Sequence, residues 1–294
     1  MKIGFIGLGI MGKPMAKNLL KAGYELNICD VNEEAVKDVA AAGGISYKNP
    51  REVAEHSDMI FTMLPNSPHV KTVVSGENGI LEGMKSGTIL VDMSSIDPTV
   101  SIELEKAVSE AGGEMIDAPV SGGEPKAVDG TLSFMCGGKK EIFEQVEPIL
   151  EKMGASVVLT GEIGSGNMTK LANQIIVAVN IAALSEALVL AAKSGVNPER
   201  VYQAIRGGLA GSTVMDAKAP MMLDRNFNPG FRIELHIKDL NNAEHAAETV
   251  DMELPMTKQV LEMMNQLQEK GMGACDHSAV LKYYEEKENV EVKR

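Results

Sequence analysis

Three glycines spaced as G-x-G-x-x-G follow a short apolar run at the start of this chain. Residues 2–6 have the length and apolar content of a buried parallel strand, and Gly7, Gly9 and Gly12 come directly after them. In this spacing the first glycine makes a tight turn, the second lets a pyrophosphate approach the backbone, and the third lets a helix pack closely on the strand. Residues 13–22 have the pattern of that helix, whose N-terminal N–H groups would face the anion.

A second apolar run leads to an acidic residue at the place where a dinucleotide-binding fold needs one. Residues 24–29 form a predicted strand that ends at Asp30, eighteen positions after Gly12. A carboxylate there accepts a hydrogen bond from a ribose hydroxyl. Glycine turns between a strand and a helix are common, so the glycine spacing alone is weak evidence. Its combination with Asp30 predicts a dinucleotide site.

Strand and helix patterns alternate through the first half of the chain, and helix patterns alone fill the second half. The alternation predicts an α/β Rossmann fold with a doubly wound, mostly parallel sheet. The predicted strands are residues 2–6, 24–29, 59–64, 88–93, 114–118, 132–136 and 156–159, and the later helices are residues 167–194, 197–206, 237–249, 255–270 and 276–287. We therefore expect a Rossmann domain over residues 1–163, an all-α domain over residues 164–294, and the active site between them.

The charge balance limits the classes of partner. Asp and Glu number 41 against 28 Lys and Arg, and the formal net charge is −13. Nucleic acids and anionic membrane surfaces need basic patches, so neither is an expected partner. A small anionic substrate stays possible, because a few local cations can dominate a pocket. Residues 171–192 approach the length of a membrane span, but polar residues interrupt them, and we expect a buried helix instead.

The cysteines show no pattern of metal ligands or disulfides. Cys29, Cys136 and Cys275 are odd in number and have no metal-ligand spacing, so we expect reduced thiols, a cytoplasmic protein and no metal site. The first apolar stretch is short and is broken by the glycine loop, which is not the pattern of a signal peptide.

Lys170 is the first candidate for chemistry. It lies near the start of a long apolar helix, and Asn173 and Gln174 follow at i+3 and i+4 on the same face. Such polar groups are costly unless they meet partners or line a cleft. A lysine there can donate a proton to a substrate oxygen. The alternative is a first-turn lysine in solvent, but the polar stripe and the preceding Gly164-Ser165-Gly166 favour a functional role.

A glycine-rich segment after another predicted strand is a candidate anion site. Residues 117–123 read DAPVSGG, and Ser121, Gly122 and Gly123 offer a hydroxyl and backbone N–H groups to a carboxylate. An ordinary strand-ending turn is an equally good interpretation of these residues alone.

Other loops follow predicted strands at the edge where ligands bind in open α/β sheets. Leu64-Pro65-Asn66 and Ser94-Ser95 both end strands, and their loops would join the ligand crevice. Lys238-Asp239 begins a helical stretch and could contact a cofactor or a substrate carboxylate. A surface ion pair explains Lys238 more simply from the sequence alone.

Taken in chain order, four motifs resemble the β-hydroxyacid dehydrogenase family, and the match covers the whole chain. The motifs are Gly7-Leu8-Gly9-Ile10-Met11-Gly12, Asp117-Ala118-Pro119-Val120-Ser121-Gly122-Gly123, Gly164-x-Gly166-x-x-x-Lys170-x-x-Asn173 and Lys238-Asp239. The resemblance implies an oxidoreductase that moves a hydride between a nicotinamide cofactor, NAD or NADP, and a small anionic aldehyde or hydroxy acid.

The resemblance also implies roles for single residues. Lys170 would be the catalytic acid, and Asn173 would orient the substrate. The substrate carboxylate would be held by Ser121, Gly122 and Gly123. Together with Asp30, the expected cofactor contacts are Gly7, Leu8, Gly9, Ile10, Met11, Gly12, Leu64, Pro65, Ser95 and Lys238.

The implied reaction is hydride transfer from nicotinamide C4 to the aldehyde carbon of tartronate semialdehyde, with glycerate as product. Succinic semialdehyde, glyoxylate and 3-hydroxyisobutyrate are alternative substrates within the family. A dinucleotide-binding sensor without turnover is the alternative of another class, which the presence of both Lys170 and Asn173 disfavours. Relatives often carry an arginine after the second strand, where it can meet a 2′-phosphate. Here Val31 and Asn32 follow Asp30, so we expect NADH to be preferred.

The long apolar helix also bears on assembly. Residues 171–192 are apolar around nearly the whole helix, which implies burial on all sides. One chain could bury this helix unaided. Relatives commonly assemble through this domain, so we expect a homo-oligomer, with a tetramer preferred to a dimer.

Overall fold

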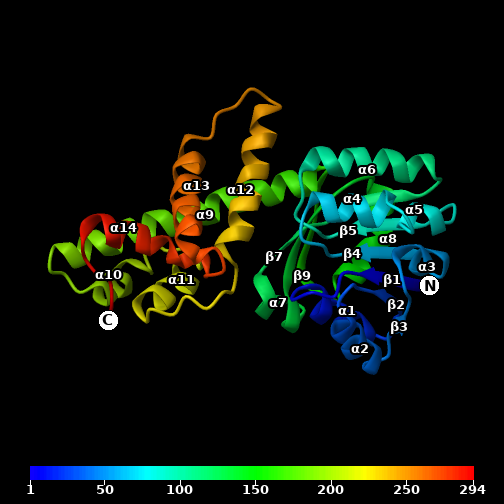
Figure 1. Ribbon diagram of the computed structural model, residues 1–294, viewed down its shortest axis with the longest axis horizontal. Coiled ribbons are helices and arrows are strands. Elements are labelled where there is room, and N and C mark those ends of the chain that lie inside the picture. The colour runs from blue at the N-terminus through cyan, green and yellow to red at the C-terminus, as the bar shows by residue number, and fades with distance from the viewer. The chain divides into compact units, whose positions relative to one another are not determined.

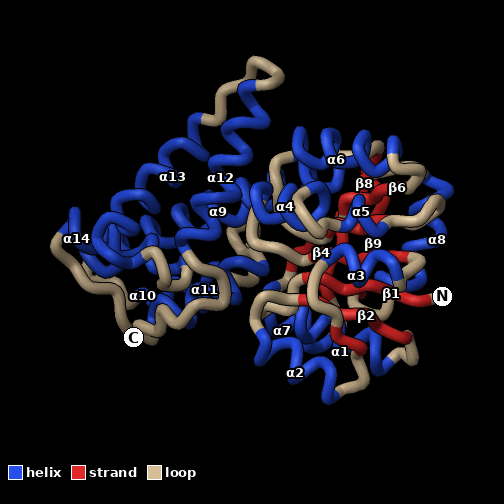
Figure 2. Tube along the Cα trace, turned by 45° about the vertical axis from the view of Figure 1, so that its right-hand side comes forward, coloured by secondary structure: helices blue, strands red, loops and turns tan.

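The chain forms two compact units in the computed structural model, which describes residues 1–294 (Figure 1). The units are Met1–Lys170 and Leu171–Arg294. All strands belong to the first unit, and the second unit is built from helices (Figure 2). The predicted fold class, a mostly parallel α/β sheet followed by a helical region, is confirmed.

A nine-stranded sheet forms the centre of the first unit. Its order is β3-β2-β1-β4-β5-β6-β8-β7, and β9 pairs with β8. Neighbouring strands from β3 to β6 are parallel, whereas β8 runs antiparallel to β6 and β7. The strands are β1 Lys2–Ile6, β2 Glu25–Cys29, β3 Ile45–Ser46, β4 Met59–Thr62, β5 Ile89–Asp92, β6 Glu114–Asp117, β7 Val120–Ser121, β8 Leu132–Gly137 and β9 Gly154–Gly161. The strand order reverses at β1, so the carboxyl ends of β1 and β4 flank a topological switch point.

Helices cover both faces of this sheet because alternate strand residues point to opposite faces. Phe5 and Phe61 pack with α1, α2 and α8 in one apolar cluster. Their neighbours Ile6 and Ile60 pack with α3, α4 and α6 in another. In Figure 1, α4 and α6 accordingly lie on the other side of the strands from α1 and α2. The helices are α1 Gly12–Lys21, α2 Glu33–Ala41, α3 Pro50–Glu55, α4 Ser67–Ser75, α5 Ile80–Gly83, α6 Pro98–Glu110, α7 Gly123–Asp129 and α8 Lys140–Leu150.

The second unit packs its helices around α9, which spans Ser165–Lys193 and begins in the first unit. Its apolar cluster includes Ile181 and Leu188 of α9, Ile237 and Met264. The remaining helices are α10 Pro198–Ile205, α11 Thr213–Leu223, α12 Ile233–Glu248, α13 Pro255–Leu267 and α14 Leu281–Glu288, with the short helical segments Gln268–Met272 and His277–Val280.

One chain does not bury α9 on all sides. Ile176 and Leu190 are 61% and 67% exposed, respectively, so part of the apolar circumference faces solvent in the single chain. The helix is also long and apolar enough to cross a membrane, a test that core helices of soluble proteins pass as well.

Candidate active site

The glycine-rich loop connects β1 to α1 at the switch point, and its three glycines meet different surroundings. Gly7 has φ +97°, and a Cβ there would lie 2.3 Å from the carbonyl oxygen of Met63. A Cβ at Gly12 would lie 1.9 Å from the carbonyl oxygen of Gly7, whereas a Cβ at Gly9 would meet nothing within 4 Å. Close packing of the backbone therefore requires a glycine at positions 7 and 12 but not at position 9. The open side of Gly9 is the one predicted to face a pyrophosphate.

The start of α1 also suits an anion. Its N-cap residue, Met11, makes no side-chain cap, and the first turn carries no acidic residue. The first N–H groups of a helix lack partners within the helix and carry a partial positive charge. The residues present therefore fit a dinucleotide phosphate at this loop.

Asp30 ties the end of β2 to the glycine-rich loop. The N–H of Leu8 donates to one carboxylate oxygen of Asp30, and the N–H of Asn32 donates to the other over 2.7 Å. Each carboxylate oxygen has more than one acceptor site, so both can still accept from a ribose hydroxyl. Asp30 was predicted to bind the ribose alone, and its second task of holding the loop has no signal in the sequence pattern.

The loops after β4 and β5 are bonded to one another at the same edge of the sheet. The N–H of Leu64 donates to Oγ of Ser94 over 2.9 Å, and the hydroxyl of Thr62 donates to Asp92 over 2.7 Å. These bonds fix the segments that carry Leu64, Pro65 and Ser95. Ser94, which was predicted only to lie in a loop of the ligand crevice together with Ser95, therefore also connects the two loops.

A buried carboxylate anchors the start of α9. Asp117 ends β6, is fully buried, and accepts the N–H groups of Gly164 over 2.8 Å and Asn167 over 2.6 Å. Burial raises the pKa of Asp117 to about 7, because desolvation outweighs these donors. The side chain of Asn167 accepts the N–H of Ile96 and donates to Ser101. Asp117 thus holds the start of α9 through bonds to residues that lie 47 and 50 positions later in the chain.

Lys170 follows this anchor by about one turn. It is 7% exposed, unlike the solvated first-turn lysine that was the alternative interpretation. Gly166, four residues earlier on the same face, has no room for a side chain, since a Cβ there would lie 2.4 Å from the carbonyl oxygen of Met135. The glycine lets α9 start close against β8, and this contact sets the place of Lys170.

Ser121 ends the short strand β7, which pairs with β8 through Ser121 and Ser133. Gly122 and Gly123 follow with φ of +139° and +70°, and α7 begins at Gly123. Both values lie in the region that favours glycine. The segment is a strand-ending turn, as one interpretation expected, and this turn leaves its hydroxyl and N–H groups at the strand end.

The candidate residues of the second unit belong to one hydrogen-bonded chain. The amide of Asn173 donates to Gln174 over 2.9 Å, and the amide of Gln174 donates to Asp239 over 2.6 Å. Lys238 forms an ion pair with Asp239 at 3.0 Å. Asp239 is 1% exposed, so this ion pair is not the exposed surface pair that the sequence favoured.

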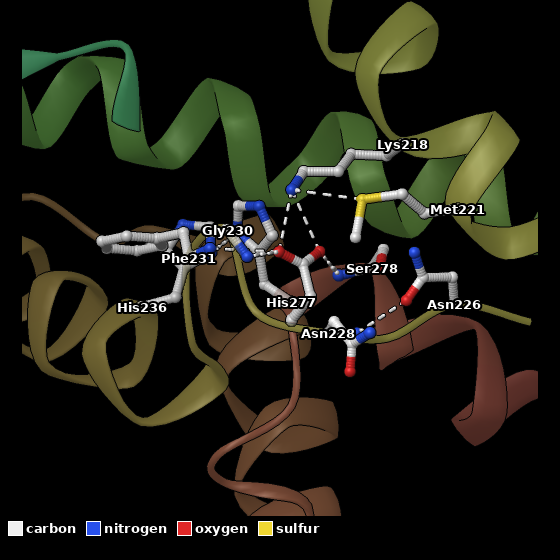
Figure 3. A network of polar contacts seen from close by, with 10 residues as sticks. Lys218, Met221, Asn226, Asn228, Gly230, Phe231, His236, His277 and Ser278 are labelled. Atoms are coloured by element: carbon white, nitrogen blue, oxygen red, sulfur yellow. Dashed lines mark hydrogen bonds and ion pairs between the residues drawn. The ribbon is translucent and has the colours of Figure 1, made fainter. Parts of the chain in front are cut away.

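A second polar network of the same unit surrounds Asp276 (Figure 3). Both carboxylate oxygens of Asp276 accept from Lys218 at 3.0 Å, and the N–H groups of Gly230, Phe231 and Ser278 also donate to them. Burial alone would raise the pKa of Asp276. Charge interactions with His277 and Lys218, together with the backbone donors, outweigh burial and lower this pKa to about 2.

The surroundings of the two histidines of this network indicate a structural role. His236 and His277 are buried, and their Nδ1 atoms lie 2.9 Å apart. Phe231 meets both rings edge-on. No group of three or more His, Cys, Asp or Glu side chains is arranged to hold a metal ion.

Family profiles match both parts of the chain. Residues 2–161 match the NAD-binding domain of 6-phosphogluconate dehydrogenase, and residues 164–284 match the NAD-binding domain of NADP-dependent 3-hydroxyisobutyrate dehydrogenase. The chain is also 46% identical over 285 residues to 2-hydroxy-3-oxopropionate reductase of Escherichia coli, covering 97% of each chain. The chain belongs to the β-hydroxyacid dehydrogenase family. It is an oxidoreductase of this family, and its Rossmann unit binds a nicotinamide cofactor.

Other members of the family match nearly the whole chain at lower identity. The mitochondrial 3-hydroxyisobutyrate dehydrogenase of Mus musculus is 38% identical over 293 residues, covering 97% of this chain and 88% of the relative. Among solved structures, the 3-hydroxyisobutyrate dehydrogenase of Mycobacterium tuberculosis with L-serine superposes with a TM-score of 0.89 at 29% identity, covering 96% of this chain and 98% of the other. The family resemblance inferred from the four motifs is confirmed.

Proposed function

We propose that this protein reduces tartronate semialdehyde to glycerate with NADH. The observation that carries the proposal is the 46% identity, over 97% of both chains, to a reductase named for this substrate, 2-hydroxy-3-oxopropionate. The mitochondrial 3-hydroxyisobutyrate dehydrogenase and the 2-(hydroxymethyl)glutarate dehydrogenase of Eubacterium barkeri are less similar, at 38% and 40% identity. The site residues support a substrate that carries one carboxylate and one reactive carbonyl.

Lys170 is the general acid in this proposal. Bound nicotinamide supplies the hydride. The ammonium of Lys170 donates its proton to the oxygen of the reduced carbonyl, and its buried place on the anchored start of α9 keeps the donor fixed. Asn173 orients the substrate, and its amide is held by Gln174.

The turn after β7 holds the substrate carboxylate. Ser121 supplies a hydroxyl, and Gly122 and Gly123 supply N–H groups from backbone that has no Cβ to block an approach. Glyoxylate is shorter than tartronate semialdehyde and succinic semialdehyde is longer, so a fixed carboxylate presents their carbonyl carbons at different distances. This difference makes tartronate semialdehyde the preferred substrate.

The cofactor contacts are the whole loop from Gly7 to Gly12, Asp30, and the residues that follow β4 and β5. The pyrophosphate lies against Gly9, and the ribose hydroxyl donates to Asp30. Lys238 contacts the cofactor, and Asp239 holds its ammonium. The last contacts are Leu64, Pro65 and Ser95. The negative charge of Asp30 favours NADH over NADPH.

The proposal extends to organisation and setting. Residues 1–163 form the nucleotide-binding domain and residues 164–294 the helical domain, which assigns the whole of α9 to the helical part. The exposed apolar residues Ile176 and Leu190 support a homo-oligomer, a tetramer before a dimer. The protein works in the cytoplasm on a small soluble substrate, with no nucleic acid or membrane as a partner.

Steady-state kinetics test the function. We expect kcat/KM with NADH to be highest for tartronate semialdehyde among tartronate semialdehyde, glyoxylate and succinic semialdehyde, and higher than for oxidation of 3-hydroxyisobutyrate with NAD. Lys170→Ala should keep fold and cofactor affinity while lowering kcat about 10²–10⁴-fold. Equal or better turnover of succinic semialdehyde would overturn the substrate and leave the family intact. A folded Lys170→Ala enzyme with near-normal kcat would overturn the assignment of Lys170. No turnover of any of these compounds by the unaltered enzyme would favour the sensor.

A further inference from the structure

A groove of about 510 Å³ opens beside the glycine-rich loop of the first unit. The loop contributes Leu8, Gly9 and Ile10 to its wall, and the facing sides of α1 and α2 contribute most of the rest. Because the groove starts at the predicted pyrophosphate position, a cofactor bound at the loop lies next to it.

Two lysines and one aspartate dominate the charge between α1 and α2. Asp38 of α2 accepts from Lys17 at 2.7 Å and pairs with Lys13 at 3.2 Å, both of them on α1. The hydrogen bonds from Lys17 and then Lys13 lower the pKa of Asp38, so its charge persists at neutral pH. One carboxylate therefore pairs with both ammonium groups that line the groove, and its charge balances one of the two.

The charges of the other ionisable groups that line the groove sum to −1. Lys21, Glu34 and Glu124 are the other ionisable side chains of its lining. With Asp38 present, three cations face three carboxylates. Without the charge of Asp38, the cations would exceed the carboxylates by one, and both Lys13 and Lys17 would be available to an anion.

The ribose end of the cofactor lies at this groove. Asn32 is part of the lining and follows Asp30 by two residues. The adenosine ribose of a dinucleotide sits at the end of the second strand, beside the residue in the place of Asp30. The side-chain oxygen of Asn32 accepts the N–H groups of Glu34 and Ala35, so it caps α2 and adds no positive charge for a phosphate.

We propose that Asp38 is a specificity-determining residue for the cofactor, because it pairs with both Lys13 and Lys17 and so withholds them from the 2′-phosphate of NADPH. The inference rests on the dinucleotide site of the proposed function but not on its aldehyde substrate. It assigns selectivity to two carboxylates with different tasks. Asp30 accepts the ribose hydroxyl, and Asp38 removes the counter-charge that a 2′-phosphate would need.

Binding titrations of Asp38→Asn test the proposal without any substrate. The substitution keeps the shape of the side chain and removes its charge, and the side chain of Asp38 is only partly buried, so we expect the fold to be kept. Calorimetric titration with NADPH should give a Kd lower than that of the unaltered protein by between about three- and tenfold, the range for one uncompensated charge near the surface. The Kd of NADH should change by less than about twofold, because it has no 2′-phosphate.

Two further variants isolate the cause. Glu144→Gln removes one carboxylate that is also paired with a lysine, Lys140, but lies on α8 outside the groove. It should leave the ratio of the two Kd values unchanged. Adding Lys17→Gln to Asp38→Asn should cancel most of the gain for NADPH. The gain should also shrink as salt is raised, since these charges are near the surface.

The outcomes separate this proposal from the proposed function. An unchanged NADPH/NADH ratio in Asp38→Asn, or an equal gain for both cofactors, would overturn the role of Asp38. An equal change of the ratio in Glu144→Gln would overturn it too, because net charge alone would then explain the effect. Failure of the enzyme to reduce tartronate semialdehyde would overturn the substrate only, since the titrations need no aldehyde.

Discussion

Gly9 is the loop position whose replacement separates binding of the cofactor from folding. Gly9 is not among the glycines with positive φ, and a Cβ there meets nothing within 4 Å. Gly9→Ala should therefore fold, and the lower entropy of its unfolded chain should stabilise it by up to about 1 kcal/mol. The melting temperature should accordingly stay the same or rise by a few degrees at most.

Cofactor binding should respond to the same methyl group very differently. The methyl occupies the space where a pyrophosphate approaches the backbone, so at least one hydrogen bond to a charged oxygen is lost, worth about 1.5–3 kcal/mol. That loss raises the Kd of NADH by between about ten- and a hundredfold. Calorimetric titration measures the Kd, and thermal denaturation of the same sample measures stability.

Gly12→Ala is the matched control. Its Cβ would lie 1.9 Å from the carbonyl oxygen of Gly7, so the loop must move, at a cost of about 1–3 kcal/mol in the free energy of unfolding. The two alanine variants should thus differ in stability although they lie three residues apart. Wild-type affinity for NADH in a stable Gly9→Ala protein would refute the placement of the pyrophosphate against Gly9.

Three other predictions concern the second unit and assembly. Lys218→Met leaves Asp276 buried without its ammonium partner, so the free energy of unfolding measured by urea titration should fall by about 3–5 kcal/mol. A fall of less than about 1 kcal/mol would contradict the pairing. Folding lowers the pKa of Asp276 from 3.8 to about 2, so above pH 4 the ionised carboxylate adds about 2 kcal/mol to the free energy of unfolding. This contribution is lost as the pH falls through 2. Urea titrations between pH 5 and pH 2 should show the loss, and it should be smaller in Asp276→Asn. Light scattering should give a mass that is a multiple of 31.4 kDa, and a monomer mass across micromolar concentrations would contradict the oligomer.

The regular elements could be predicted from the sequence because their patterns are local. The strands at residues 2–6 and 114–118 agree with β1 and β6 to within one residue. Helices α3 and α4 were not predicted, although each has a readable start: Asn49 and Asn66 cap them, and each has a proline in its first turn. Their apolar faces are too short to stand out as a helical period.

The tasks of the buried polar residues could not be predicted in the same way. Asp117 lies 47 residues before Gly164, whose N–H it accepts, and Lys218 lies 58 residues before Asp276. Neither pair leaves a signal in a short window, since only the folded backbone brings the partners together. The motif around Asp117 was recognised, but its use as the anchor of α9 became visible only in the structure.

Aspartates at the ends of parallel strands share one role at the carboxyl edge of this sheet. Asp30 after β2 accepts the N–H groups of Leu8 and Asn32, and Asp117 at the end of β6 accepts those of Gly164 and Asn167. Asp92, at the end of β5, accepts from Thr62 and from the N–H of Ser94.

Asp30 and Asp117 each join a strand to a loop or helix start that is distant in the chain, and Asp92 joins the end of β5 to the end of β4 and to its own following loop. These segments of the edge are therefore fixed before any ligand arrives. A preformed site spends less binding free energy on ordering its own groups. The proposed hydride transfer needs its donor and acceptor carbons to be aligned, and in this proposal the aspartates contribute by fixing the backbone rather than by reacting. The general acid in the proposed reaction is Lys170, whose place follows from the helix start that Asp117 holds.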